Sequence, residues 1–565
     1  MAVRLGARNR IAAGQWKGVF ATKDPGDADP RLLVAARNVY IPDPEAGSGV
    51  YSRPGFPLLN GGTVIHSNVT PFKGQGIFTN FDVNGDPTNW MAFGGKLYRY
   101  DAATDTATDV TPVGVTIDAN TTTRVYFASL GGVMAVSDGV NRPWIASNLS
   151  STPITGTYID FDSAGGAWVA FGPPVVFGGS GFFVLTSVTA VGARLDIAWT
   201  EPNNWALGYQ QTGYDNRWTL EQTGTTPING LAGTNIALYY WRQRSIGSIS
   251  GAVGPDLAST ATHDAISTNV GTAAPQTIVQ FGDTIYFCDV IGRPWSFTLG
   301  SRPKPIWHQL RAIVDESETG YPGLTMDTAT AGFDPTLNQV CMAIWSPNPA
   351  SAASPTDMQV FDANSGAYVG KWSIGPGETG ISIDCIGSFV DAQGRGQLVV
   401  LGSATSGGTT GYAWGMSALT SVPAMLTLED DTTLLVTEAT PGLYLTTEGS
   451  SGTWMDDDEV PLIEATTDRL GYSEDYVWLF DEATILTGSQ APITITVQTP
   501  NTSGSLEGTP TPNDSDDSVY RSVCGLDLNG RGAMVTVSPT TADEAWSLQR
   551  VTLVGVPSPA APDDQ

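Results

Sequence analysis

The side chains able to act as nucleophiles, bases or metal ligands are few and widely separated in this sequence. The histidines are His66, His263 and His308, and the cysteines are Cys288, Cys341, Cys385 and Cys524. No group of them has the spacing of a zinc site or of a redox-active cysteine pair, and no nucleophile elbow begins a Ser-His-Asp triad. We therefore expect buried free thiols, no metal, no cofactor and no catalytic residue.

Carboxylates are abundant but their positions alone assign no chemistry. Glycoside hydrolysis needs two carboxyl groups at a defined separation in space, which the order of 56 Asp and Glu residues does not give. The segment from Asp82 to Asp86 resembles the opening of a calcium loop, yet Phe93 stands where an EF-hand needs its acidic ligand. A tight hairpin turn is the expected structure there, with calcium binding by an Asp-rich turn as the alternative.

Aromatic side chains are the other candidates for a binding surface. The tryptophans inside or beside apolar runs are Trp90, Trp144, Trp241, Trp295, Trp345 and Trp372. We expect them to pack in the core, with a sugar-stacking platform as the alternative. Ser137-Asp138-Gly139 before Trp144 resembles the Asp-box turn of sialidase-type propellers, although the Ser-x-Asp-x-Gly spacing is not met.

Charge limits the classes of partner. The formal net charge is −29 and the isoelectric point about 4.2, so the surface repels nucleic-acid phosphates and anionic membranes. Residues 1–53 hold eight Lys and Arg against five acids, whereas the last 165 residues hold four against 24. No secretory signal or transmembrane stretch is apparent, so we expect synthesis in the cytoplasm and no membrane insertion.

The elements that must position these residues are mostly strands. Runs rich in β-branched and aromatic residues, separated by Asn-Gly, Asp-Gly and Ser-Gly turns, predict strands at 236–241, 284–288, 397–401, 432–437, 442–447, 493–497 and 533–537. Residues 493–497 alternate strictly, as a half-buried strand does. Helices are predicted at 29–38, where Asp29 can cap and Pro30 suits the first turn, and at 307–316.

Two segments near the middle of the chain repeat one pattern. Each is a strand, an Asp-led turn and Arg-Pro-Trp, ending at Trp144 and at Trp295. The two tryptophans lie roughly 150 residues apart, about three blades of a β-propeller. The pattern predicts an irregular propeller of six to eight blades.

The predicted fold is all-β, an irregular β-propeller followed by a C-terminal β-sandwich. We divide the chain into an N-terminal arm with the first strands (1–70), the propeller (71–425), an acidic connecting segment (426–459), the sandwich (460–556) and a disordered tail (557–565).

A family resemblance rests on the N-terminal region. Asn38-Val39-Tyr40-Ile41-Pro42-Asp43, followed by Arg53-Pro54-Gly55-Phe56, resembles an element of the tail nozzle (tail tubular protein B) and tail hub (packaged-DNA-stabilising) proteins of short-tailed bacteriophages. The strand order around Gly271-Thr272-Ala273-Ala274-Pro275 and Gly282-Asp283-Thr284-Ile285-Tyr286-Phe287 is similar to that family's blades. The likeness covers about 70% of the chain and contains no catalytic motif.

The resemblance implies a structural virion protein of the phage tail. It implies a homo-oligomer, a hexameric ring, that lines the DNA exit channel without binding double-stranded DNA specifically. An adaptor or portal-side ring and tail fibres or a needle are the implied neighbours. Arg31, Arg37 and Arg53 are the candidates for contacts between subunits.

On this interpretation the protein is not an enzyme. Two other interpretations stay open, a glycan-binding propeller module and a propeller glycoside hydrolase. Binding of glycans by a monodisperse monomer would favour the first, and turnover of a polysaccharide would favour the second.

Overall fold

The structure is a computed structural model of the chain. It describes residues 9–14, 16, 33–42, 44, 50–146, 148–159, 168–187, 196–200, 202, 205, 210–211, 214–220, 226–253, 257–310, 329–344, 355–374, 381–403, 409–416, 426–427, 434–435, 464–467, 476–487, 493–499, 503–508, 511–513, 516–530, 533–539 and 547–559.

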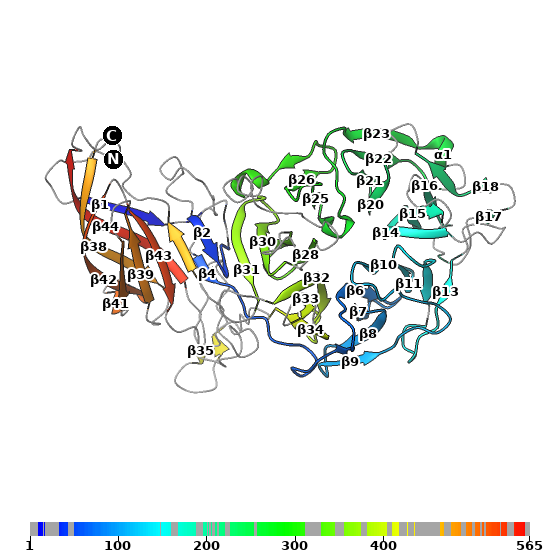
Figure 1. The fold of residues 1–565 in the computed structure, drawn as a ribbon, viewed down its shortest axis with the longest axis horizontal. Helices are drawn as coiled ribbons and strands as arrows, with labels where there is room; N and C mark the ends of the chain where they lie inside the picture. Colours follow the sequence, from blue (N-terminus) through cyan, green and yellow to red (C-terminus); the bar gives the residue numbers. More distant parts are fainter. Residues whose placement is uncertain are drawn as a thin grey trace. The chain divides into compact units, whose positions relative to one another are not determined.

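Short antiparallel sheets make up nearly all of the fold, which confirms the predicted propeller followed by a sandwich (Figure 1). The chain divides into two compact units, a sandwich unit (residues 1–57, 369–379 and 416–565) and a propeller unit (residues 58–368 and 380–415). The helical elements in the described part are single turns, α1 (Leu257–Thr260), η2 (Pro275–Thr277) and η3 (Trp307–Leu310). None of the helices found there is long and apolar enough to cross a membrane.

In its described residues the propeller unit contains seven blades, within the predicted range of six to eight. The first three are β6 (Gly74–Phe81), β7 (Pro87–Phe93), β8 (Lys96–Asp101) and β9 (Thr106–Asp109); β10 (Tyr126–Leu130), β11 (Val133–Ser137), β12 (Trp144–Ala146) and β13 (Thr157–Tyr158); and β14 (Trp168–Phe177), β15 (Ser180–Ser187), β16 (Asp196–Trp199) and β19 (Arg217–Thr219). A two-stranded hairpin, β17 (Gln210–Gln211) and β18 (Tyr214–Asp215), precedes β19.

The remaining blades follow in chain order. They are β20 (Ile228–Gly233), β21 (Leu238–Arg242), β22 (Ile246–Ser250) and β23 (Thr262–Ser267); β24 (Val279–Phe281), β25 (Thr284–Cys288), β26 (Pro294–Thr298) and β27 (Lys304–Pro305); β28 (Thr330–Asp334), β29 (Gln339–Ala343) and β30 (Asp357–Asp362); and β32 (Ser382–Val390), β33 (Gly396–Ser403), β34 (Thr410–Gly415) and β5 (His66–Ser67). After the sixth blade the chain leaves the propeller unit within β31 (Tyr368–Ser373).

Tight turns join the strands of a blade. The Gly131-Gly132 pair between β10 and β11 has φ values of 58° and 79°, and Gly178-Gly179 between β14 and β15 has 57° and 79°. Positive φ at both central residues is the type I′ geometry that matches the twist of a hairpin. The glycines therefore fix the pairing register of these inner strands.

Apolar side chains fill the spaces between neighbouring blades. Separate clusters of buried residues lie between blades one and two, two and three, three and four, four and five, and seven and one. Of the six tryptophans singled out in the sequence, Trp90, Trp144, Trp241 and Trp372 are buried and Trp295 is half-buried, whereas Trp345 lies outside the described residues. The expected role in the core is therefore confirmed for the first four.

A segment that precedes the first blade closes the ring. Its strand β5 is the fourth strand of blade seven, where His66 pairs with Gly411 and Ser67 with Thr410. The amide of Leu59 also donates to the carbonyl of Ala413, and that of Ile65 to the carbonyl of Gly411. The seventh blade thus takes its outer strand from the beginning of the unit.

The sandwich unit draws strands from both ends of the chain. One sheet contains β3 (Val39–Tyr40), β4 (Val50–Ser52), β44 (Ser547–Pro559), β38 (Tyr476–Thr487), β42 (Asp516–Gly530) and β41 (Thr511–Asn513), with β1 (Asn9–Gly14) also on β44. The other contains β31, β2 (Leu33–Arg37), β37 (Glu464–Thr467), β43 (Met534–Pro539), β39 (Ile493–Gln498) and β40 (Ser503–Gly508). In β39 alternate residues are buried, as the sequence predicted.

Several segments differ from the sequence-based prediction. Residues 33–37 form strand β2 rather than a helix, because pairing with β37 and burial of Leu33 and Ala36 outweigh a moderate helix preference. The second predicted helix is only the turn η3 in its described part. Strand β44 continues to Pro559, three residues into the tail that we expected to be disordered.

The acidic connecting segment lies mostly outside the described residues. Its described part is the short hairpin of β35 (Leu426–Thr427) and β36 (Leu434–Leu435), and the second of these falls in a predicted strand. The strand predicted at 442–447 lies outside the described residues.

Candidate functional site at the axis of the propeller

The innermost strands of the blades begin near one end of the propeller axis, and a polar cluster lies there. The phenol of Tyr126, on β10 of blade two, donates to Oε1 of Gln276, just before β24 of blade five, over 3.3 Å. Blades two and five are three positions apart in the ring, so this hydrogen bond spans the axis. The two side chains therefore bridge the axial opening of this propeller.

Beside this bridge, Arg124 ties three blades together. Its guanidinium donates to the backbone carbonyls of Asp384 and, over 3.2 Å, of Gly74. The Asp384 carboxylate in turn accepts the amide of Gly74 at 3.0 Å. Arg124 is 8% and Asp384 2% exposed, which means that both charged groups have lost most of their contact with water. The hydrogen bonds to Gly74 and between the two residues offset this cost of desolvation. We call Arg124, Tyr126, Gln276 and Asp384 the axial cluster.

The thiol nearest to the axial cluster is unsuited to nucleophilic chemistry. Burial raises the pKa of Cys385 to about 11, and Arg124 opposes this only in part. A thiol with such a pKa is protonated at neutral pH, and the thiolate is the reactive form. All four cysteines are free, as expected, and three are buried.

Carboxyl groups are scarce on the innermost strands. Among the described residues of these seven strands, only Asp334 on β28 and Asp384 on β32 carry one. Gly332 on β28 lies beside Ile386 on β32. Asp334 comes two residues after Gly332, and Asp384 comes two residues before Ile386. The two aspartates are therefore offset by about four residues along the strands, which is roughly 13 Å. That exceeds the separation of about 5–9.5 Å that glycosidase carboxylates need. These two groups therefore do not form such a pair.

Asp334 is a buried acid at the end of its strand. Its Oδ1 accepts the amide of Thr336 at 2.9 Å, while Oδ2 is buried without a hydrogen-bond partner. Gln339, its cross-strand neighbour, has an equally unpartnered Oε1. Burial raises the pKa of Asp334 to about 7. A proton on Oδ2 would supply the donor that these two acceptors lack.

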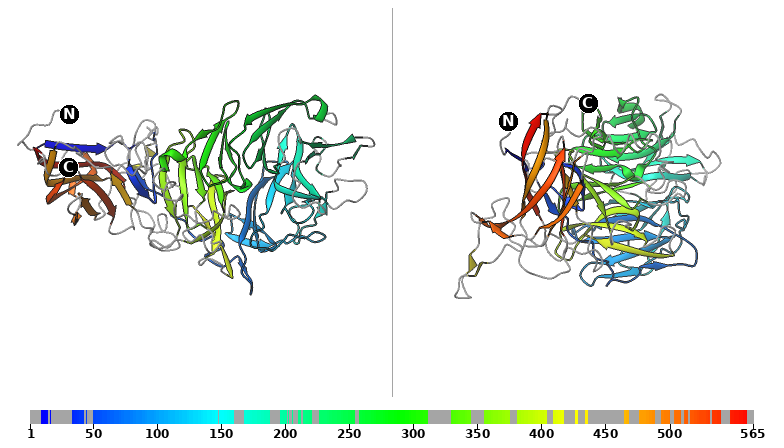
Figure 2. Two further views of the ribbon diagram at one scale, coloured as in Figure 1. Left: turned by 45° about the horizontal axis from the view of Figure 1, so that its top comes forward. Right: turned by 60° about the vertical axis from the view of Figure 1, so that its left-hand side comes forward.

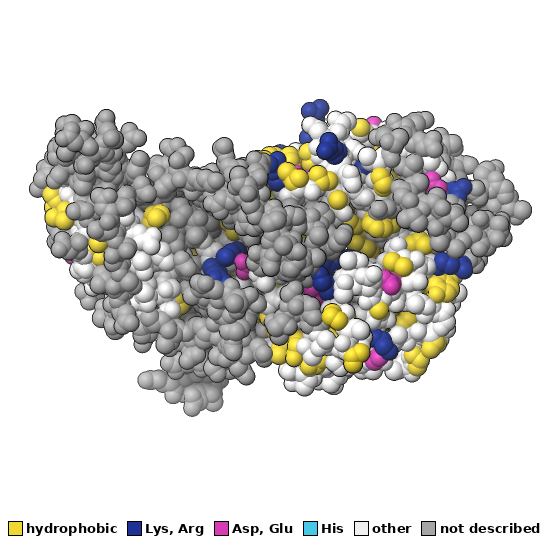
Figure 3. Space-filling view, viewed as in Figure 1, with side chains coloured by type: hydrophobic (Ala, Val, Ile, Leu, Met, Phe, Trp, Pro, Cys, Tyr) yellow, Lys and Arg dark blue, Asp and Glu magenta, His cyan; other side chains and the backbone are white. Residues whose placement is uncertain are grey.

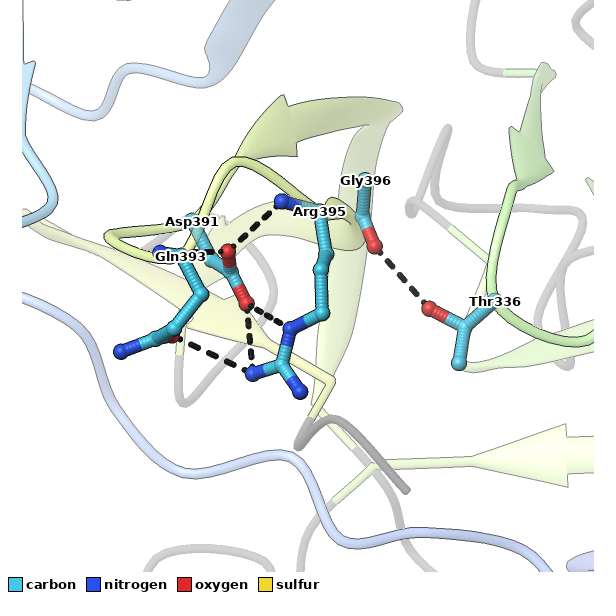
Figure 4. Close-up of polar contacts among 5 residues, drawn as sticks. All are labelled: Thr336, Asp391, Gln393, Arg395 and Gly396. Atoms are coloured by element: carbon cyan, nitrogen blue, oxygen red, sulfur yellow. Dashed lines mark hydrogen bonds and ion pairs between the residues drawn. The ribbon is translucent and has the colours of Figure 1, made fainter. Parts of the chain in front are cut away.

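One Asp-led turn recurs at the ends of three hairpins, at Asp82, Asp289 and Asp391. In the turn at Asp391 the carboxylate accepts the amides of Gln393 at 2.9 Å and Arg395 at 2.8 Å, and it also binds the Arg395 side chain (Figure 4). The hydroxyl of Thr336 in the neighbouring blade donates to the carbonyl of Gly396 at 3.0 Å in the same region (Figure 4). The turn therefore also contributes to the contact between blades six and seven.

The Asp82 turn has the same geometry. It joins β6 to β7, and Asp82 accepts the amides of Asn84 and Asp86 at 2.7 and 2.9 Å. The expected hairpin turn is confirmed, and the carboxylate is used within it. These hydrogen bonds to the charged form, that from Asp86 first, lower the pKa of Asp82. In the part of the chain that the structure describes, no group of three or more His, Cys, Asp or Glu is placed to hold a metal ion.

The two Arg-Pro-Trp segments occupy equivalent positions in blades two and five, so the predicted spacing of three blades is confirmed. Each lies at the turn from the second to the third strand. The guanidinium of Arg142 lies 5.2 Å from the ring centre of Tyr158, and that of Arg293 lies 4.7 Å from that of Trp307. All four side chains are half-buried. These cation–π pairs place a planar face and a charge together near the surface.

Two of the histidines have structural partners. His66 on the closing strand shares a hydrogen bond of 2.7 Å with the phenol of Tyr98, and His263 shares one with the phenol of Tyr240. Burial lowers the pKa of each imidazole, so both favour the neutral form. For His308 the structure describes the backbone only.

The arginines proposed for contacts between subunits have different environments. Arg31 lies outside the described residues, and Arg37 is half-buried with Nε and Nη2 each 3.3 Å from the Ser373 hydroxyl. Arg53 is 1% exposed and donates to Asn38 Oδ1 at 3.1 Å, to the Pro54 carbonyl at 2.7 Å and to the Ser373 carbonyl at 2.6 Å. These bonds give Arg53 a role within its own chain.

Asn38 completes this network. Its Oδ1 accepts the amide of Ser373 at 2.9 Å, and its φ of 53° is left-handed, a conformation that Asn tolerates. The Arg53 guanidinium lies 4.8 Å from the ring centre of Phe56, which packs on Trp372. We call Asn38, Arg53, Phe56, Trp372 and Ser373 the arginine node.

Comparison with known proteins adds little to this geometry. No family model matches the sequence, and no curated protein does. Among solved structures, the chain matches an exo-β-1,3-galactanase from Phanerochaete chrysosporium with galactose, at 10% identity over 76% of this chain and 95% of that one, with a TM-score of 0.25. A variant of that enzyme with β-1,3-galactotriose matches at 9% identity over 86% and 100%, with a TM-score of 0.23.

These matches correct one expectation from the sequence. The matched structures are enzymes, so the prediction that this chain is not an enzyme is contradicted and is withdrawn. TM-scores this low assign no activity, substrate or site residue to this chain.

Sequence reasoning did not find the axial cluster or the buried Asp334–Gln339 pair. No local pattern relates Tyr126 to Gln276, which lies 150 positions later, and only ring closure brings the two side chains together. The repeated Arg-Pro-Trp pattern was the one signal that related blades two and five.

The arginine node provides a test of stability. Replacing Arg53 by Met keeps most of the volume but leaves three buried acceptors without their donor, so we expect the sandwich unit to lose roughly 3–5 kcal/mol. Urea denaturation followed by circular dichroism measures this. Arg395→Met is the control, because that side chain is 49% exposed and should cost no more than about 1 kcal/mol. Equal losses in the two variants would contradict the role of the node.

Asp334 provides a test by pH. Burial raises the pKa of the Asp334 carboxyl to about 7 in the folded state. The folded protein therefore keeps a proton on this carboxyl at pH values where the unfolded chain has already released it. The free energy of unfolding should therefore fall as the pH rises from about 4 to 7, by up to about 1.4 kcal/mol per unit. In Asp334→Asn this contribution should be absent relative to the parent protein in the same buffers. Identical pH slopes in the two proteins would show that Asp334 does not titrate in this window.

Proposed function

We propose that this protein is an assembly component of a phage tail, a nozzle or hub subunit that forms a ring in the virion. The observation that carries the proposal is the arginine node. Asn38 and the Arg53-Pro54-Gly55-Phe56 segment, which carry the family resemblance, bind each other and Ser373 in one buried network. The motif is therefore more than an ordinary turn, and its residues have a shared structural reason to occur together.

The axial cluster restricts where a channel could lie. Because Tyr126 and Gln276 bridge the axis of the propeller, the DNA exit channel of our proposal lies between subunits and not through a propeller. A net charge of −29 suits the wall of such a channel, because a surface with the same sign of charge as the phosphates does not hold the DNA during ejection. On the face shown in Figure 3, the described Lys and Arg side chains are dispersed and form no continuous stripe.

Imaging of the purified full chain tests this function. We expect negative-stain electron microscopy and light scattering to show a ring with a central pore, six-fold by analogy with the family. The virion tail is the expected location, and antibodies against the chain should label its distal end. A monodisperse monomer at all concentrations, together with unlabelled virions, would contradict the proposal.

A second candidate function is glycan binding or cleavage on the propeller. It is favoured by the half-buried pairs of Arg142 with Tyr158 and Arg293 with Trp307, since aromatic faces beside polar groups suit sugar rings. Assays on the same purified full chain separate the two candidate functions. Saturable binding or hydrolysis of a polysaccharide by a monomer, with loss of that signal in Trp307→Ala, would support the glycan-related function and count against the tail-assembly function.

A further inference from the structure

The seam between blades one and seven contains the segment that closes the ring, residues 58–68, which we call the closing segment. Both views in Figure 2 show the blue strands of blade one beside the yellow strands of blade seven. On the blade-seven side, the closing segment pairs with β34 through β5. On the blade-one side, Asp105 accepts the amides of Asn60 and Gly61, each at 2.8 Å. The hydrogen bonds of this segment therefore connect the first blade to the last.

His66 is the ionisable side chain of β5, and it lies inside this seam. It is 8% exposed, and its Nδ1 lies 2.7 Å from the phenol oxygen of Tyr98 on β8 of blade one. Its Nε2 is buried and has no hydrogen-bond partner among the described residues. The ring packs edge-on against Phe72, with 4.3 Å between ring centres, and a Cβ placed on Gly94 would lie 3.1 Å from Nε2. Neither of these two neighbours has a side-chain acceptor to offer to Nε2.

This geometry suits the neutral imidazole. A neutral ring carries one N–H and one acceptor nitrogen, and the Tyr98 hydroxyl can serve either of them at Nδ1. A protonated ring has two N–H donors, so Nε2–H would be buried without an acceptor and a charge would be buried with it. Tyr98 does not ionise to offset that charge, because burial raises its pKa to about 12.

The described charged groups that act on His66 belong to blade one. Lys96 on β8 and Asp109 on β9 form an ion pair of 3.5 Å. Burial lowers the pKa of His66, Lys96 lowers it further, and Asp109 opposes both effects. The residues of β34 that pair with β5, Thr410 and Gly411, do not ionise. The surroundings of the closed ring therefore favour the neutral form of His66.

We propose that His66 makes closure of the propeller sensitive to acid, so that proton uptake by its imidazole favours release of the closing segment from β34. In the open state the imidazole is solvated, and a solvated imidazole has a pKa of about 6.5. Closure is therefore strongest above that pH and weakens as the pH falls below it, because the open state takes up the proton more readily than the closed state. This effect concerns the propeller alone and is independent of the proposed function.

Hydrogen–deuterium exchange of the full chain measures the effect at pH values of about 7.5 and 5.5, on either side of the solvated pKa. Dividing the intrinsic rate of each amide by its observed rate at the same pH gives a protection factor. The open fraction rises about tenfold over this range if the closed state takes up no proton. We expect the protection factors of residues 58–68 and of β34 to fall by up to this factor. The fall should be absent in His66→Gln, whose amide can still bind Tyr98 but does not ionise.

His263→Gln is the matched control. The imidazole of His263 also shares a hydrogen bond with a phenol, that of Tyr240, but it lies in blade four. The closing segment should therefore keep the pH dependence of the parent protein in this variant. Asp334 in blade six titrates with the opposite sign and is present in all three proteins, so its contribution cancels in the comparison. An equal fall in the parent protein and in His66→Gln would overturn the proposal.

A second measurement needs no variant. Exchange of the imidazole C2 hydrogen, followed by mass spectrometry, reports the pKa of each of the three histidines in the unaltered chain. We expect the titration midpoint of His66 in the folded chain to lie below its midpoint in urea. An equal or higher midpoint in the folded chain would overturn the proposal, even if His66→Gln does not fold.

Discussion

The closure of the propeller is the constraint on which the rest of its structure depends. Blade seven obtains its fourth strand, β5, from residues that precede blade one, and the amides of Leu59 and Ile65 add hydrogen bonds to β34. The apolar clusters between blades bury their side chains only if every blade has a neighbour on both sides. A circular arrangement supplies those neighbours, and the noncovalent pairing of β5 with β34 holds the circle shut.

Closure also explains the buried polar groups. Arg124 and Asp384 lie on blades two and seven and reach each other and Gly74 because blade one lies between them. The bridge from Tyr126 to Gln276 exists because blades two and five face each other across the axis. In the sandwich unit, the arginine node has the same character, since buried donors and acceptors from three segments satisfy one another.

Local pattern was sufficient for the strands but not for their partners. The strand predicted at 284–288 is β25 with the same bounds, and the alternation in residues 493–497 is seen in β39. Residues 33–37 have a composition typical of a helix but form a strand, because they pair with β37. This pairing depends on a segment more than 400 residues away, so the local sequence does not indicate it. For the same reason the sequence placed the N-terminal segment apart from the sandwich, and Tyr126 apart from Gln276. Arg53 was recognised as important, but its burial follows from contacts with residues over 300 positions away.

Hydrogen–deuterium exchange of the whole protein tests the closure most directly. If residues 58–68 hold the ring shut, amides of this segment and of β34 should exchange only with the opening that also exposes the inner strands β6 and β32. Their protection should then be lost together as urea is added. Rapid exchange of residues 58–68 while β6 and β32 stay fully protected would show that the ring closes without them, and would contradict this account.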